Sequence, residues 1–123
     1  MKRDERLAGL SSDHHQALVL ARRIEEGALT AAELQARFDA EVAPHFAVEE
    51  ELLLPALRAI GASDLAGRTA DDHAKIRDAL ARAQAGDQAA LAAFAALLIG
   101  HVRFEEREVF PACEGGLGAS VLE

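Results

Sequence analysis

Apolar residues recur every three to four positions along most of the chain, which is the period of amphipathic α-helices. Short turns centred on Gly27, Gly61 and Gly86 interrupt this pattern. They divide the chain into four helices, predicted at about 12–27, 31–60, 64–85 and 88–113. Loops of a few residues favour antiparallel neighbours. We therefore predict an all-α fold, an up-down-up-down antiparallel four-helix bundle that forms a single domain over residues 1–123.

The predicted helix ends carry residues that commonly cap helices. Ser11 and Ser12 are expected to cap the first helix, because their hydroxyl groups can accept hydrogen bonds from free backbone N–H groups. The segment 30–33, Thr-Ala-Ala-Glu, has the pattern of a capping box for the second helix. Pro44 falls inside the second helix and is predicted to kink it, because proline has no backbone N–H to donate.

The second and fourth predicted helices share one sequence pattern at a fixed offset of 56 residues. In each, a His is followed four residues later by a pair of Glu residues and then by Pro-Ala, over residues 45–56 and 101–112. The first and third helices share Asp-His, at 13–14 and 72–73, with an offset of 59. The chain therefore resembles two copies of one helical hairpin.

Two carboxylates fall on apolar stripes of these helices. Glu49 lies near the middle of the stripe on the second helix, and Glu105 lies near the middle of the stripe on the fourth. His45 and His101 stand one turn before them on the same faces. A carboxylate in a core is costly unless it is paired, protonated or bound to a metal, and neither stripe carries Lys or Arg. This pattern predicts a buried metal site.

The other two helices each offer one further histidine. His73 lies at the margin of the apolar stripe on the third helix. In the first helix, His14 and His15 diverge by about 100°. The stripe of this helix is predicted to contain Ala17, Leu18, Ala21 and Ile24. His14 lies closer to that stripe, so we predict that His14 is the ligand and that His15 is exposed.

The predicted metal ligands are therefore four imidazoles and two carboxylates: His14, His45, Glu49, His73, His101 and Glu105. A mixed nitrogen and oxygen set suits iron, and also manganese or zinc. An isolated His and Glu pair at this spacing more often stabilises a helix than binds a metal. Four histidines and two central carboxylates in a duplicated pattern favour the metal.

Charge and composition limit the kinds of partner and the cellular compartment that we expect for this chain. The chain has 21 acidic and 13 basic residues and a net charge of −8, which disfavours binding to nucleic acid or an anionic membrane surface. No apolar run approaches the roughly 20 residues of a membrane span, and the charged first ten residues predict no signal peptide. A single cysteine excludes an internal disulfide. These features predict a cytoplasmic protein, and 11 Arg against 2 Lys with 28 Ala are typical of a GC-rich bacterial genome.

The segments His45-Phe46-x-x-Glu49-Glu50 and His101-x-x-x-Glu105-Glu106, with one His on each other helix, resemble the hemerythrin-like (HHE cation-binding) domain family. The resemblance extends from Leu10 to Pro111. It implies a four-helix bundle that holds two irons with an oxo or hydroxo bridge. In residue terms, it implies that one iron is held by His14 and His45, that the other is held by His73 and His101, and that Glu49 and Glu105 bridge them.

The third helix departs from the pattern of the oxygen-carrying members of this family, which have a second His one turn along it. Here Arg77 stands four residues after His73 and Thr69 stands four residues before it, and neither can replace an imidazole. Those members also have an Asp in the fourth helix where this chain has Glu105. The chain therefore resembles the four-His, two-Glu subset. The Glu-x-x-His pattern of ferritin-like di-iron bundles does not occur.

These features predict a non-haem di-iron protein that binds O2 or a related small diatomic for sensing, storage or redox response. Three alternatives stay open at this point. The first is a di-iron enzyme acting on peroxide or nitric oxide, and the second is a protein for iron storage or delivery. The third is an interaction module in which the histidines and carboxylates are only structural.

Overall fold

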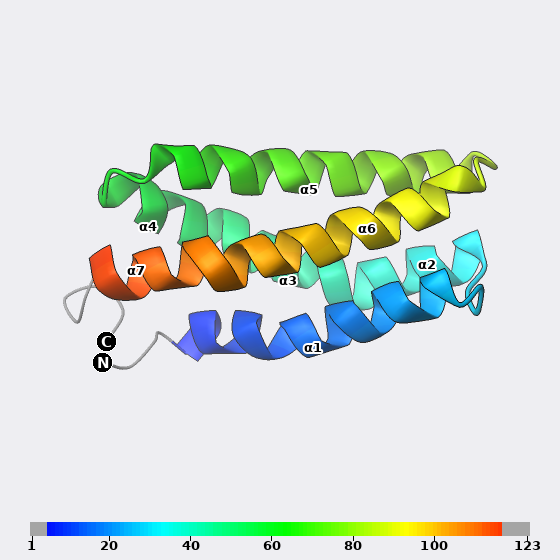
Figure 1. Ribbon diagram of the computed structural model, residues 1–123, viewed down its shortest axis with the longest axis horizontal. Coiled ribbons are helices and arrows are strands. Elements are labelled where there is room, and N and C mark those ends of the chain that lie inside the picture. Colours follow the sequence, from blue (N-terminus) through cyan, green and yellow to red (C-terminus); the bar gives the residue numbers. More distant parts are fainter. Residues whose placement is uncertain (1–4, 117–123) are drawn as a thin grey trace.

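The computed structural model describes residues 5–116, with side chains for residues 13–114. Four long helical segments run back and forth along one axis (Figure 1). The first is α1 (Glu5–Glu25) and the third is α5 (Ser63–Gln84). The second is built from α2 (Ala31–Arg37), η1 (Phe38–Val42), α3 (Ala43–Val48), η2 (Glu49–Leu53) and α4 (Leu54–Ala59), where η denotes a π-helix. The fourth is built from α6 (Ala89–Phe104), η3 (Glu105–Val109) and α7 (Phe110–Gly116). No strand occurs between residues 5 and 116, so the predicted all-α class is confirmed.

The segments reverse direction at short turns placed at the ends of the molecule (Figure 1). The glycines predicted to end helices, Gly27, Gly61 and Gly86, have positive φ angles of 71°, 79° and 102°. This left-handed conformation is easily adopted only by glycine, and it ends a helix. The fourth segment packs against α1 and α5, while α2 and α4 pack against α5.

The capping box predicted for the second segment is present. The backbone N–H of Glu33 donates to Thr30 Oγ1 at 3.1 Å, and the backbone N–H of Thr30 donates to Glu33 Oε1 at 2.9 Å. In this box each residue satisfies a donor that the helix itself leaves free. The second segment therefore begins where the sequence indicates.

The first helix differs from its prediction in two respects. Within the described residues it already includes Glu5, well before the predicted start near residue 12, so Ser11 and Ser12 lie within the helix and do not cap it. The residues before them include the good helix formers Glu5 to Ala8, which extend the helix. The apolar period predicts Leu18 in the core, but this side chain is 41% exposed, whereas Leu20 is buried. The buried face is thus centred on Ala17, Leu20, Ala21 and Ile24.

Each of the three prolines in the helices follows a π-helical segment. Pro44, Pro55 and Pro111 come two residues after the ends of η1, η2 and η3. In each case the residue just before the proline donates its N–H five residues back, as Leu54 does to Glu49. A π-turn changes the hydrogen-bond register where proline cannot donate. The structure therefore has a widened π-helical turn before Pro44, where the sequence predicted a simple kink. A turn of the same kind precedes each of the other two prolines.

The core consists of two apolar clusters separated by a polar layer. One cluster lies towards the α1–α2 turn and contains Leu20, Leu34, Phe94 and Leu98 among others. The other lies towards the α4–α5 turn and includes Leu57 and Phe110. The buried histidines and carboxylates occupy the layer between these clusters. In residues 5–116, no helix has the length and apolar character required to cross a membrane.

Candidate metal centre

All six predicted ligand side chains converge on the polar layer between the two apolar clusters. Each of them is buried: His14, His45, Glu49, His73, His101 and Glu105. Their ligand atoms form two groups, and within each group all atoms lie within 4.8 Å of one another. The first group is His14, His45, Glu49 and Glu105, and the second is Glu49, His73 and His101. Glu49 belongs to both groups, whereas Glu105 belongs to the first.

The two oxygens of Glu49 point to different histidines. Oε1 lies 2.7 Å from His73 Nε2 and 3.3 Å from His101 Nε2. Oε2 lies 3.2 Å from His45 Nε2. A carboxylate that divides its oxygens between two sets of imidazoles has the geometry required to bridge two cations.

Glu105 has a less symmetric position. Its Oε1 lies 2.9 Å from His14 Nε2, 3.4 Å from His101 Nε2 and 3.9 Å from His45 Nε2. Both central carboxylates, Glu49 and Glu105, are the first residues of π-helical segments, η2 and η3. π-bulges in α-helices are frequent at functional sites because they change the direction in which a side chain points.

Four further carboxylates, the outer carboxylates, contact the far nitrogen of each histidine. They are Asp13, Glu50, Asp72 and Glu106. His73 Nδ1 lies 2.7 Å from Glu50, and His101 Nδ1 lies 2.9 Å from Asp72.

The outer contacts follow the duplication of the chain. His14 Nδ1 lies 2.7 Å from Glu106, and His45 Nδ1 lies 3.1 Å from Asp13. Asp13 and Asp72 therefore each accept a hydrogen bond from a His of their own sequence repeat. Glu50 and Glu106 each accept one from a His of the other repeat.

These outer contacts determine how the imidazoles can act. An ionised carboxylate only accepts hydrogen bonds, so Nδ1 of each histidine carries the proton and donates it outward. In a neutral imidazole, Nε2 then presents its lone pair to the central carboxylates. The lone pairs of Nε2 and of the carboxylate oxygens would repel one another unless a cation or a proton lay between them.

The chemistry of the central oxygens fits a metal. Glu49 Oε2 and Glu105 Oε2 are buried and accept no well-formed hydrogen bond from any described residue, although His45 Nε2 lies 3.2 Å from Glu49 Oε2. A buried carboxylate oxygen left in this way is costly. Two donors about 2.1 Å from one ion and at right angles to each other lie about 3 Å apart. Most of the contacts between Nε2 atoms and the central carboxylates have separations close to this value.

The same layer attracts positive charge, as the pKa values show. Burial lowers the pKa of His45, but Glu105 and Glu49 outweigh it and raise that pKa to about 10. The pKa of His101 is likewise raised to about 10 by Asp72 and Glu49 against the effect of burial. Burial and the neighbouring Glu49 raise the pKa of Glu105. Burial also raises the pKa of Glu49, but contacts with Glu105 and His101 hold it well below its usual range. The carboxylates therefore favour cations here, as protons on histidine or as a metal ion.

Arg77 and Thr69 have roles that do not require them to act as ligands. Thr69 donates its hydroxyl proton to the backbone carbonyl of Leu65 at 2.9 Å. Arg77 Nη1 donates to Glu50 Oε2 at 2.8 Å, on the same oxygen that accepts from His73. Its guanidinium also lies 5.4 Å from the ring centre of Phe46, which stacks on His73. Arg77 thus helps to fix the orientation of an imidazole that it does not touch.

Sequence reasoning did not assign the outer carboxylates to their histidines. Each of the four was visible only as an acidic neighbour of a predicted ligand, one residue before a His or one after a central Glu. The pairs Glu50–His73 and Glu106–His14 join residues far apart in the chain. Their signal was the duplication itself, because the same acidic positions recur in both halves. His15 is exposed, in agreement with its expected orientation.

Glu50→Gln is expected to weaken metal binding by about 10- to 100-fold, since outer partners orient the ligating imidazole and raise its basicity. The measurement is competition for metal against a chromophoric chelator. Glu51→Gln is the matched control, because it removes the same charge from the adjacent exposed position. Equal affinity in the Glu50 and Glu51 variants would show that the contact with His73 has no role in metal binding.

A helical protein in which histidines and carboxylates from all four segments meet in the core belongs to the class of metal-binding helical bundles. The chain matches the model of the Hemerythrin HHE cation binding domain over residues 5–113. It therefore belongs to this family, as the sequence resemblance predicted. No curated protein and no solved structure matches the chain significantly.

Proposed function

We propose that this protein is a non-haem di-iron protein that binds O2 or a related small diatomic, for sensing, storage or redox response. The observation that carries the proposal is the position of Glu49 in a buried layer, where one oxygen lies near His73 and His101 and the other lies near His45. Membership of a cation-binding family supports the metal. The mixed imidazole and carboxylate set supports iron over calcium or magnesium, which prefer oxygen ligands alone.

In this proposal the up-down-up-down bundle holds two ions side by side. His14 and His45 bind one ion, and His73 and His101 bind the other. Glu49 and Glu105 bridge the ions and offset part of their charge. Manganese or zinc can occupy the same donors. Two imidazoles and shared carboxylates supply fewer than six donors to each ion, which leaves room for a small external ligand.

A pair of ferrous ions supplies electrons that a bound oxygen molecule can accept. The chain's own residues provide the surroundings for that chemistry. The outer carboxylates hold the Nδ1 protons of the histidines and keep Nε2 directed inward. Phe46 stacks on His73 at 3.8 Å and Phe110 stacks on His14 at 5.3 Å, so an aromatic ring covers one histidine of each set. This apolar cover shields His73 and His14 from water.

The test is metal content together with the visible spectrum. Protein produced with ample iron is expected to hold about two irons per chain, since four imidazoles and two shared carboxylates are a dinuclear donor set. The charge-transfer spectrum is expected to change on reduction and to change again on exposure to air. One iron per chain, or none, in well-folded protein would contradict the di-iron proposal.

Assays on the same preparation separate the alternatives. A binding protein or sensor shows no sustained turnover of peroxide or nitric oxide, whereas a di-iron enzyme does. Ready transfer of iron to a mild chelator indicates iron delivery. Buried ligands and outer hydrogen bonds predict slow release instead.

A further inference from the structure

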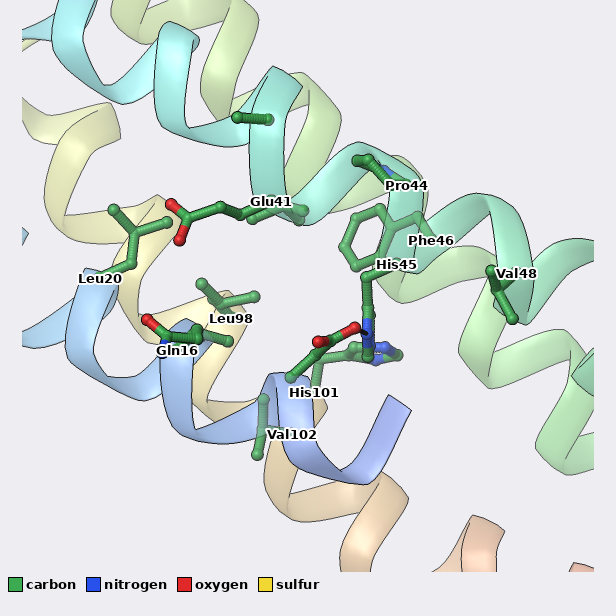
Figure 2. A pocket seen from close by; sticks show the side chains of 14 residues that line it. Gln16, Leu20, Glu41, Pro44, His45, Phe46, Val48, Leu98, His101 and Val102 are labelled. Atoms are coloured by element: carbon green, nitrogen blue, oxygen red, sulfur yellow. Dashed lines mark hydrogen bonds and ion pairs between the residues drawn. The ribbon is translucent and has the colours of Figure 1, made fainter. Parts of the chain in front are cut away.

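A pocket of about 410 Å³ lies beside the polar layer, between α1, the η1–α3 turn and α6. His45 and His101 form its inner end. Figure 2 shows Gln16 of α1 and Glu41 of η1 on opposite walls, at the end away from these histidines. Two of its lining residues, Gln16 and Pro44, are exposed to solvent.

The pocket occurs where the two sequence repeats differ. Ala17 lines it, and the residue 59 positions later is Ile76, which is fully buried. Val102 also lines it, and the residue 56 positions earlier is Phe46, whose ring stacks on His73. At both positions the residue that lines the pocket has a smaller side chain than its counterpart in the other repeat. These two differences between the repeats leave less side-chain volume to fill this side of the bundle.

The volume of the pocket is much larger than a diatomic requires. One water molecule occupies about 30 Å³ of liquid, and O2 is of comparable size. Pockets that hold organic ligands range from about 300 to 1,000 Å³ and are mostly apolar with a few polar groups. Leu20, Phe46 and Leu98 supply apolar walls, in agreement with this description.

The charge of the lining favours one kind of ligand. Two carboxylates line the pocket, those of Asp13 and Glu41, and no Lys or Arg is among the described lining residues. Arg37 pairs with Glu41 from outside this lining, and Asp13 accepts a hydrogen bond from His45. The chain as a whole carries a net charge of −8. Although both carboxylates already have a partner, the lining offers an ammonium group two carboxylate acceptors and offers an anionic head group no Lys or Arg.

We propose that this pocket binds a small organic amine, with its apolar body between α1 and α6 and its ammonium group near Glu41 and Gln16. This binding site goes beyond the proposed metal function. Its wall residues Ala17 and Val102 are not among the metal ligands. The amine would lie beside His45 and His101 at the inner end of the pocket.

The test compares benzylamine, benzyl alcohol and benzoate, which share one aromatic body, by equilibrium dialysis against the full chain with its metal bound. Benzylamine is expected to bind most tightly, and benzoate at least about tenfold more weakly. Ala17→Ile and Val102→Phe copy the side chains of the other repeat into the pocket. Each is expected to weaken benzylamine binding by at least about tenfold, with metal content unchanged.

The matched control is Ala36→Ile, which adds the same side chain at an exposed position of α2 outside the pocket and should leave benzylamine binding unchanged. Circular dichroism shows whether Ala17→Ile or Val102→Phe, the two filled variants, fails to fold. If one of them does, benzylamine binding by the other one tests the proposal. Equal binding of the three compounds would overturn the proposal, as would benzylamine binding that persists in a folded filled variant. Failure to bind benzylamine would also overturn it. Metal analysis of the same samples tests the di-iron proposal separately.

Discussion

Replacing Glu49 with alanine is expected to remove most of the bound metal, lowering it from about two ions per chain to well under one, because a bridging ligand serves both ions. Glu49 is the residue that belongs to both groups of ligand atoms, and its side chain is fully buried. Glu105→Ala is also expected to remove much of the bound metal, because Glu105 is the second proposed bridge and its Oε1 lies within 4 Å of His14, His45 and His101. Elemental analysis of purified variants measures both results.

The control for these variants is Glu51→Ala, which removes a carboxylate from an exposed position two residues after Glu49. It should retain the metal content of the unaltered protein. Circular dichroism should show that all three variants keep their helices, since the two apolar clusters on either side of the layer remain intact. A Glu49 variant that still binds two ions would show that the metal lies elsewhere.

Replacing His14 with alanine is expected to lower the metal content by about one ion per chain, whereas replacing His15 should have little effect. His14 is buried, its Nε2 lies 2.9 Å from Glu105, and its Nδ1 lies 2.7 Å from Glu106. His15, the next residue on the same helix, is exposed. Metal analysis and thermal unfolding of the two variants provide the comparison.

These two adjacent histidines are each other's control, because the chemical change is identical and only the helix face differs. The expected loss of thermal stability follows the loss of metal, since an ion bound only by the folded state stabilises that state. If His15→Ala loses the metal and His14→Ala retains it, the first-helix ligand has to be reassigned to His15.

Local patterns in the sequence determined much of this protein. The apolar period and the glycine turns predicted an all-helical chain, and the capping box at Thr30 and Glu33 was placed correctly. Spacings of three and four residues put side chains on one helix face. For this reason the helical period alone assigns His45 and Glu49, and likewise His101 and Glu105, to the interior. The duplicated His and Glu pattern also predicted the family.

Periodicity located some boundaries and faces less well. It placed Leu18 in the core, but the rotation of α1 in the bundle buries Leu20 instead. It also missed the π-helical segments before the prolines, because their wider turns depend on how each helix compensates for a missing donor. Errors of this kind arise because the final rotation of a helix is fixed by its neighbours.

Contacts between helices were decided only by the tertiary structure. The sequence did not specify which carboxylate would meet which imidazole, and the pairs Glu50–His73 and Glu106–His14 join different segments. The different positions of Glu49 and Glu105 relative to the histidines also appear only in three dimensions. The pocket beside His45 is likewise visible only in three dimensions, where Ala17 and Val102 line the same space from two helices. Sequence patterns specify which face of a helix is buried, but the neighbours of that face depend on the packing of all four segments.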